Sequence, residues 1–170
     1  MASTTWIIDK AHSEITFKVK HMMISTVSGR FNDFDSTVDT DGENLSTAKI
    51  QFSAEVNSID TRNSQRDGHL KSADFFDAEN HPQITFVSTG FDGAHLTGDL
   101  TLRGVTKQVT LSVETGGIIT SDGQKRAGFE VEGKINRKDF GLSWSALTEA
   151  GGMVVADEVK ISANVEYVQA

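Results

Sequence analysis

The chain alternates between apolar and polar residues along most of its length. One clear stretch pairs the apolar set Ala48, Ile50, Phe52, Ala54 and Val56 with the polar set Lys49, Gln51, Ser53 and Glu55. A period of two places each set on its own face of a strand, so the pattern predicts a strand with one buried and one solvent-facing side. The same alternation recurs near residues 15–19, 27–38, 84–87, 94–102, 109–113, 129–135 and 159–167.

Short turns separate these strands. Their residue pairs are typical of tight hairpins and comprise Asp41-Gly42, Asp92-Gly93, Arg103-Gly104 and Asp122-Gly123. About eight strands with short connections, and no strand–helix–strand rhythm, indicate an all-β protein. The pattern alone predicts an antiparallel fold and leaves barrel and sandwich open.

Three segments depart from simple alternation. Phe31 and Phe34 are three residues apart, and an extra residue near Asn32-Asp33, a β-bulge, would turn both rings to the core. Residues 61–77 are polar, and Asn63 or Ser64 could cap a short helix there. Residues 21–25 are expected to form one helical turn.

Composition narrows the class of protein. A length of 170 residues fits a single domain, 1–170, and no apolar run is long enough for an integral membrane segment. The net charge of −8 disfavours nucleic acid and anionic membranes as general partners. The absence of cysteine excludes disulfides and thiolate metal sites. No targeting signal precedes the first strand, so the expected location is the cytoplasm, or the periplasm if an export signal has been removed.

No motif of a known catalytic centre stands out. The histidines are scattered without ligand spacing, so we expect no metal site and no cofactor. If the protein were an enzyme, His12, His21 or His69 would be the acid/base candidates. Arg66, Asp67 and His69 form a polar cluster that could be catalytic but more often fixes a loop through hydrogen bonds.

The expected interior contains many small residues. A closed eight-stranded barrel is either just filled by side chains or holds one small ligand. The small inward residues would leave an elongated apolar space, and they are Gly29, Ala48, Ala54, Ala94, Gly98, Ala127, Gly133 and Ala163. Alternatively, large neighbours fill the gaps, namely Phe17, Phe31, Phe52, Phe86 and Phe129. The residues alone leave both alternatives open.

Strand phase also predicts which side chains would line a ligand site. They are Phe17, Val19, Met22, Phe31, Phe34, Ile50, Phe52, Ala54, Phe86, Leu100, Leu111, Phe129, Val131, Trp144, Met153, Ile161 and Ala163. Two segments have the composition of a mobile mouth. Residues 21–24 carry flexible methionines, and residues 142–154 contain the Gly151-Gly152 pair.

Several segments, in order, resemble the YceI-like family, lipocalin-like lipid- or polyisoprenoid-binding proteins of bacteria. The matching segments are Trp6-x-x-Asp9-x-x-His12-Ser13-x-Ile15-x-Phe17, Gly29-x-Phe31-x-x-Phe34, Arg66-Asp67-x-His69-Leu70, Pro82-x-Ile84-x-Phe86, Gly98-Asp99-Leu100-Thr101-Leu102-Arg103-Gly104 and Arg137-x-Asp139-Phe140-Gly141. The likeness spans nearly the whole chain.

The resemblance implies a closed antiparallel eight-stranded β-barrel whose interior takes a long apolar chain, such as an isoprenoid or fatty acyl compound. It implies a homodimer and no enzymatic activity, with Arg66, Asp67 and His69 fixing a loop. The expected role is that of a carrier, storage or stress-related protein. An enzyme acting on an isoprenoid lipid, or a barrel without any ligand, are the alternatives.

Overall fold

The computed structural model describes residues 3–144 and 155–170. Strands dominate these residues, as the alternation predicts. They are β1 (Ser3–Ile8), β2 (Glu14–His21), β3 (Ser25–Phe31), β4 (Phe34–Asp41), β5 (Asn44–Glu55), β6 (Ile59–Asp60), β7 (Gln83–Phe91), β8 (His95–Leu102), β9 (Val105–Ser121), β10 (Gln124–Asn136) and β11 (Val155–Gln169). The helical elements are η1 (Lys10–His12), η2 (Val56–Ser58), α1 (Ser64–Lys71) and η3 (Arg137–Phe140).

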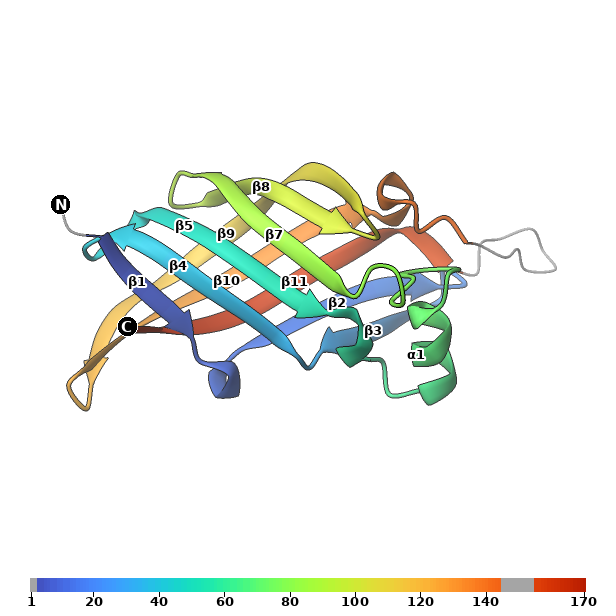
Figure 1. Ribbon diagram of the computed structural model, residues 1–170, viewed down its shortest axis with the longest axis horizontal. Helices are drawn as coiled ribbons and strands as arrows, with labels where there is room; N and C mark the ends of the chain where they lie inside the picture. Colours follow the sequence, from blue (N-terminus) through green and yellow to red (C-terminus); the bar gives the residue numbers. More distant parts are fainter. Residues whose placement is uncertain (1–2, 145–154) are drawn as a thin grey trace.

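The strands close into one antiparallel barrel (Figure 1). Eight strands, β1, β4, β5, β7, β8, β9, β10 and β11, pair in that order, and β1 pairs again with β11 to close the ring. Strands β2, β3 and β6 continue β1, β4 and β5 beyond short interruptions, so eight long strand paths carry the whole sheet. The barrel is therefore the eight-stranded one that the resemblance implies, and the sandwich alternative is wrong.

The interruption between β3 and β4 falls at Asn32 and Asp33. Phe31 and Phe34 are both buried, as the predicted bulge requires. The interruption between β1 and β2 was not predicted. The alternation contains its signal, however, because the core residues Trp6 and Ile8 are even-numbered whereas Ile15 and Phe17 are odd-numbered, so an inserted turn must reverse the phase.

Helix α1 uses Asn63, one of the two predicted caps. The Asn63 side chain accepts a hydrogen bond from the backbone N–H of Arg66. The helix and η3 lie together at one end of the barrel, whereas the start of β1 and the C-terminus lie at the other (Figure 1). We call these the α1 end and the terminal end. None of the described helices is both long and apolar enough to cross a bilayer.

The helical turn expected at residues 21–25 is wrong. This segment is a tight hairpin turn in which the Ile24 N–H donates to the His21 carbonyl at 3.2 Å. Met22 and Met23 occupy its two central positions with φ of 53° and 59°. Two consecutive left-handed residues are the signature of a type I′ turn.

Candidate ligand site in the barrel interior

Toward the terminal end of the barrel the core is buried around one small cavity, and its buried polar groups are paired. Trp6 is only 1% exposed, and its indole N–H donates to Thr40 Oγ1 at 2.9 Å. The buried Tyr167 hydroxyl lies 2.8 Å from Ser36 Oγ, which itself donates to the Gln51 carbonyl. Burial raises the pKa of Tyr167 to about 12, against the opposing effect of the Ser36 hydrogen bond. This end is a closed core.

Toward the α1 end, the interior carries a continuous apolar surface. Pairing places Val27, Val19, Val159 and Ile135 side by side in one row across β3, β2, β11 and β10. The next row contains Gly29, Phe17, Ile161 and Gly133. We call these two rows the apolar wall. Except at Gly29, its residues are only partly buried although they face inward, whereas Trp6, Val38 and Tyr167 toward the terminal end are buried.

The inward glycines do not create the elongated space that the sequence allowed. A Cβ at Gly29 would overlap the Phe17 ring, one at Gly98 the Phe86 ring, and one at Gly133 the Leu111 side chain. Each glycine therefore makes room for a large neighbour. The alternative in which phenylalanine rings fill the gaps is correct at Gly29 and Gly98.

An aromatic cluster lies at the α1 end of the barrel. The Phe76 ring packs edge-on against Phe31, at 6.2 Å between centroids. His69 packs edge-to-face against both Phe75 and Trp144, with centroids 5.1 Å and 4.7 Å away. Trp144 and Phe76 are only partly buried, so this cluster adds accessible apolar surface at the α1 end.

Two hollows differ in character. An interior cavity of about 50 Å³ lies between Phe91, Phe129 and Tyr167, and its lining is almost wholly apolar. It is far below the roughly 300–1,000 Å³ of a small-molecule site, so a long chain would also have to occupy the region of the apolar wall. The larger hollow, about 1350 Å³, is open and lies on the outer face of β2, β3, β10 and β11. Charged and hydroxyl side chains such as Lys18, Glu132 and Lys160 line it, so it does not suit an apolar chain.

Most predicted lining residues face the interior. The fully buried ones are Phe31, Phe34, Ala54, Phe86 and Leu100, and the partly buried ones are Phe17, Val19, Ile50, Phe52, Leu111, Phe129, Val131, Ile161 and Ala163. Trp144 lies in the aromatic cluster instead of on a strand.

Two predicted inward residues lie elsewhere. Met22 does not face the interior, because it is 43% exposed in the hairpin turn. Ala94 is exposed because the Asp92 carboxylate accepts hydrogen bonds from its N–H and from that of His95, which folds this segment into the β7–β8 turn. Met153 and the Gly151-Gly152 pair lie outside the described residues.

Arg66 and Asp67, both on α1, form hydrogen bonds with Thr61, which precedes the helix. Asp67 Oδ1 accepts hydrogen bonds from the backbone N–H and the hydroxyl of Thr61, at 2.9 Å and 2.5 Å. Arg66 donates to the Thr61 hydroxyl and carbonyl. His69 lies 2.9 Å from Asp74. The Thr61 contacts join α1 to the end of β6, and the His69–Asp74 contact joins α1 to the residues that follow it.

Arg137 is a structural residue whose role the sequence did not reveal. It is only 3% exposed, and it donates to the carbonyls of Leu142, Trp144, Val155 and Ala156. Burial lowers its pKa, with Asp157 opposing that effect. The guanidinium thus ties η3 and the residues after it to the start of β11. The only sequence signal was its place in the last matching motif.

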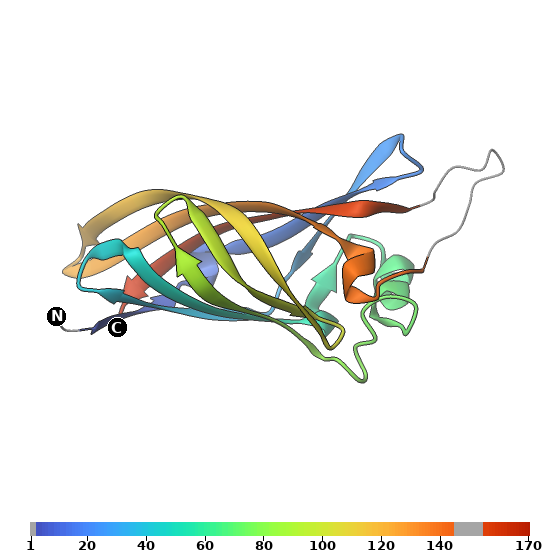
Figure 2. The ribbon, with the colours of Figure 1, turned by 90° about the horizontal axis from the view of Figure 1, so that it is seen from above.

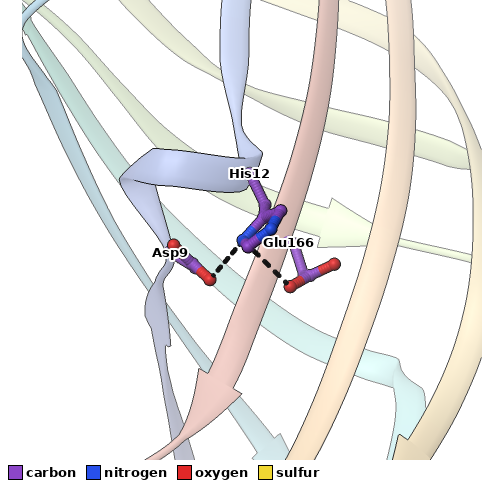
Figure 3. Close-up of side chains that lie close together, drawn as sticks. All are labelled: Asp9, His12 and Glu166. Carbon is purple, nitrogen blue, oxygen red and sulfur yellow. Dashed lines mark hydrogen bonds and ion pairs between the residues drawn. The ribbon is translucent and has the colours of Figure 1, made fainter.

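The strand interruption at η1 brings together three groups that resemble a metal site. Asp9, His12 and Glu166 each offer a ligand atom, and these atoms lie within 4.8 Å of one another (Figure 3). His12 Nδ1 is 2.8 Å from Asp9 Oδ2. This bond lowers the pKa of Asp9 and raises that of His12, and a second bond from Arg126 lowers the Asp9 pKa further.

The same cluster already contains a cation. Arg126 donates to Asp9 Oδ2 at 2.9 Å and to Glu166 Oε2 at 2.7 Å, so its guanidinium occupies the carboxylate oxygens that a metal would need. Backbone hydrogen bonds connect the same segments: the Asp9 N–H donates to the Glu166 carbonyl, and the Glu166 N–H donates to Ser13 Oγ. The cluster fixes the junction between β1, β2 and β11, and His12 is 65% exposed there.

Comparisons with known proteins agree with this architecture. The YceI-like domain matches residues 6–167. A UPF0312 protein of Staphylococcus aureus is 38% identical over 166 residues, which cover 96% of this chain and 97% of the relative. The crystal structure of BcnA from Burkholderia cenocepacia superimposes with a TM-score of 0.77 at 26% identity, covering 94% of this chain and 98% of that one.

A third comparison extends the likeness of the fold. A polyisoprenoid-binding domain from Saccharophagus degradans shares a TM-score of 0.71 at 15% identity, over 97% of this chain and 98% of that domain. At this identity the likeness concerns the fold alone. The match of the domain over nearly the whole chain, together with the closed barrel, establishes the relationship: the protein belongs to the YceI-like family.

Proposed function

We propose that the protein binds a long apolar chain, such as a polyisoprenoid or a fatty acyl compound, inside the barrel toward the α1 end. The observation that carries the proposal is the apolar wall, whose inward-facing side chains stay partly exposed. Covering that surface with a ligand would contribute about 25 cal/mol per Å² of apolar area removed from water. The solved domain from Saccharophagus degradans, which is described as polyisoprenoid-binding, supports this class of ligand.

The geometry favours binding over chemistry. The three histidines that could act as acid or base lie on separate elements, His12 in η1, His21 at the end of β2 and His69 on α1. His12 and His69 are each engaged by a neighbouring carboxylate. General acid–base catalysis requires a group within hydrogen-bond reach of the reacting atom, and the apolar wall itself contains no titratable side chain. We therefore propose a carrier or storage role.

Two tryptophan substitutions on β11 test the site. Ala163 faces the interior and is partly buried, whereas its neighbour Asn164 faces outward and is exposed. Ala163 pairs in register with Ile15 and Val131, in the row next to the apolar wall, so Ala163→Trp would occupy the interior there at an overpacking cost of about 1–3 kcal/mol. Asn164→Trp is the matched control. Ala54, which is 1% exposed, is a poorer choice because its surroundings are already filled.

Native mass spectrometry of gently purified protein gives the readout, followed by organic extraction to identify any bound lipid. The parent and Asn164→Trp are expected to carry or take up a prenol or fatty acid, and folded Ala163→Trp is expected to lose it. A parent protein that neither retains nor takes up such a chain would contradict the proposal, as would equal uptake by Ala163→Trp. The same spectra show whether the protein is the homodimer that the resemblance implies.

A further inference from the structure

The hairpin of β2 and β3 ends in three exposed apolar residues. Met22, Met23 and Ile24 are 43%, 63% and 84% exposed. Figure 2 shows this hairpin standing clear of the barrel at the α1 end. We call the three residues the hairpin tip. Most isolated exposed apolar residues need no explanation, but three in succession on a projecting turn form a local apolar surface.

The backbone of the tip is also unfavourable for its residues. Two other turns among the described residues contain consecutive left-handed positions, and both place glycine second, as Arg103-Gly104 and Asp122-Gly123. The tip instead has methionine at both positions. Side chains with a Cβ are strained in this conformation, and Asn-Gly is the preferred pair. Neither folding nor solubility explains methionine here, so the exposed side chains point to a role outside the fold.

The hairpin that carries the tip is basic. Residues 15–31 contain Lys18, Lys20 and Arg30 and no acidic residue, although the whole chain has a net charge of −8. Lys18 pairs in register with Lys160 of β11, which adds a third lysine to the same outer face. Asp157 and Glu158 of β11 lie between the residues that pair with His21 and Val19, and they form ion pairs with Lys134, Arg137 and Lys138. Among the described residues, neither Lys18 nor Lys20 forms an ion pair. The net charge that disfavours anionic membranes overall therefore does not describe this hairpin.

We propose that the hairpin tip docks on an anionic phospholipid bilayer, with Met22, Met23 and Ile24 entering the interface and the lysines facing the headgroups. A small convex apolar tip beside basic residues matches the way peripheral proteins bind membranes. A protein partner fits less well, because three side chains offer much less than the roughly 800 Å² per partner of a stable interface. Docking does not require a ligand in the barrel, so it is independent of the proposed function.

A labelling experiment tests the docking directly. The chain has no cysteine, so Met23→Cys carries the only thiol and can take an environment-sensitive fluorophore. Ile119→Cys is the matched control, because Ile119 is 62% exposed but lies beside the β9–β10 turn at the terminal end. With vesicles of phosphatidylcholine containing roughly three-tenths phosphatidylglycerol, we expect a blue shift at position 23 and none at position 119.

Two binding variants complete the test in a vesicle flotation assay. Met22→Asn combined with Met23→Gly installs the preferred turn pair, so it should raise Tm by about 2 °C or more while lowering vesicle binding about tenfold. Lys18→Glu with Lys20→Glu should abolish the preference for anionic vesicles.

The proposal is overturned if the parent fails to bind anionic vesicles, or if the turn variant binds them as the parent does. It is also overturned if the tip substitutions convert a dimer to a monomer without affecting vesicle binding, because the tip would then be a surface between two copies. Each result is independent of whether native mass spectrometry finds a ligand in the barrel.

Discussion

Tyr167, Trp6 and the inward glycines show how single residues shape the interior. The polar ends of Trp6 and Tyr167 find partners in Thr40 and Ser36, so aromatic bulk fills the terminal end without an unpaired buried group. Gly29 and Gly98 admit the rings of Phe17 and Phe86. At the hairpin tip, by contrast, Met22 and Met23 each adopt a left-handed conformation that costs about 1–2 kcal/mol.

The ionisation of Tyr167 tests the closed core at the terminal end. The chain has one tyrosine, so tyrosinate absorbance near 295 nm reports this residue alone. Its folded pKa of about 12 lies above the ordinary value of 10.0, so the neutral hydroxyl is favoured in the folded state. The stability it contributes is present below the unfolded pKa and is lost as the pH rises through the folded pKa.

We therefore expect no tyrosinate signal between about pH 9 and 11 while circular dichroism shows an intact fold. Ser36→Ala serves as a comparison, since it removes the hydrogen bond that opposes the upward shift and should not lower the midpoint. A midpoint near 10 in the folded protein would mean that the terminal end admits water.

At the scale of elements, the alternation predicted the strands because one face of each is buried. A break in the alternation located the Asn32-Asp33 interruption, and the capping residues Asn63 or Ser64 indicated the start of α1, for which the structure uses Asn63. The alternation missed η1, whose signal is only a change of phase between Ile8 and Ile15. The hairpin turn was misjudged because two methionines lack the glycine that normally marks such a turn.

The loop before α1 provides the prediction at this scale. Thr61 is 3% exposed, and Asp67→Ala would leave its N–H and hydroxyl without their acceptor. Leaving buried donors unsatisfied should lower the free energy of unfolding by about 2 kcal/mol and Tm by roughly 4–8 °C. Asp74→Ala is the control, because its partner His69 and Asp74 itself are partly exposed and such pairs contribute about 0–1 kcal/mol.

Thermal melts of Asp67→Ala, Asp74→Ala and the parent test whether Asp67 stabilises the loop. If Asp67→Ala has the same Tm as the parent but no longer retains lipid, Asp67 belongs to a binding or catalytic site. The loop-fixing interpretation would then be wrong.

The whole molecule is a barrel with unequal ends. Toward the terminal end the core is buried around one small cavity and its polar groups are paired, whereas the α1 end carries partly exposed apolar residues, an aromatic cluster and the projecting hairpin (Figure 2). Strand phase predicted which side chains face inward, and most of them do. Strand phase could not predict which inward-facing side chains remain partly exposed. That depends on how Phe17, Phe86 and Leu111 pack against glycines on other strands.

The two tryptophans lie at opposite ends of this barrel and allow the most direct test of the central claim. In Trp6→Phe all indole emission comes from Trp144 at the α1 end, and in Trp144→Phe all of it comes from Trp6 in the closed core. A bromine-substituted fatty acyl chain quenches indole only at close range. Titrating it into both variants, we predict saturable quenching of Trp144 and little quenching of Trp6. Equal quenching of both, quenching of Trp6 alone, or none at all would contradict a ligand site toward the α1 end.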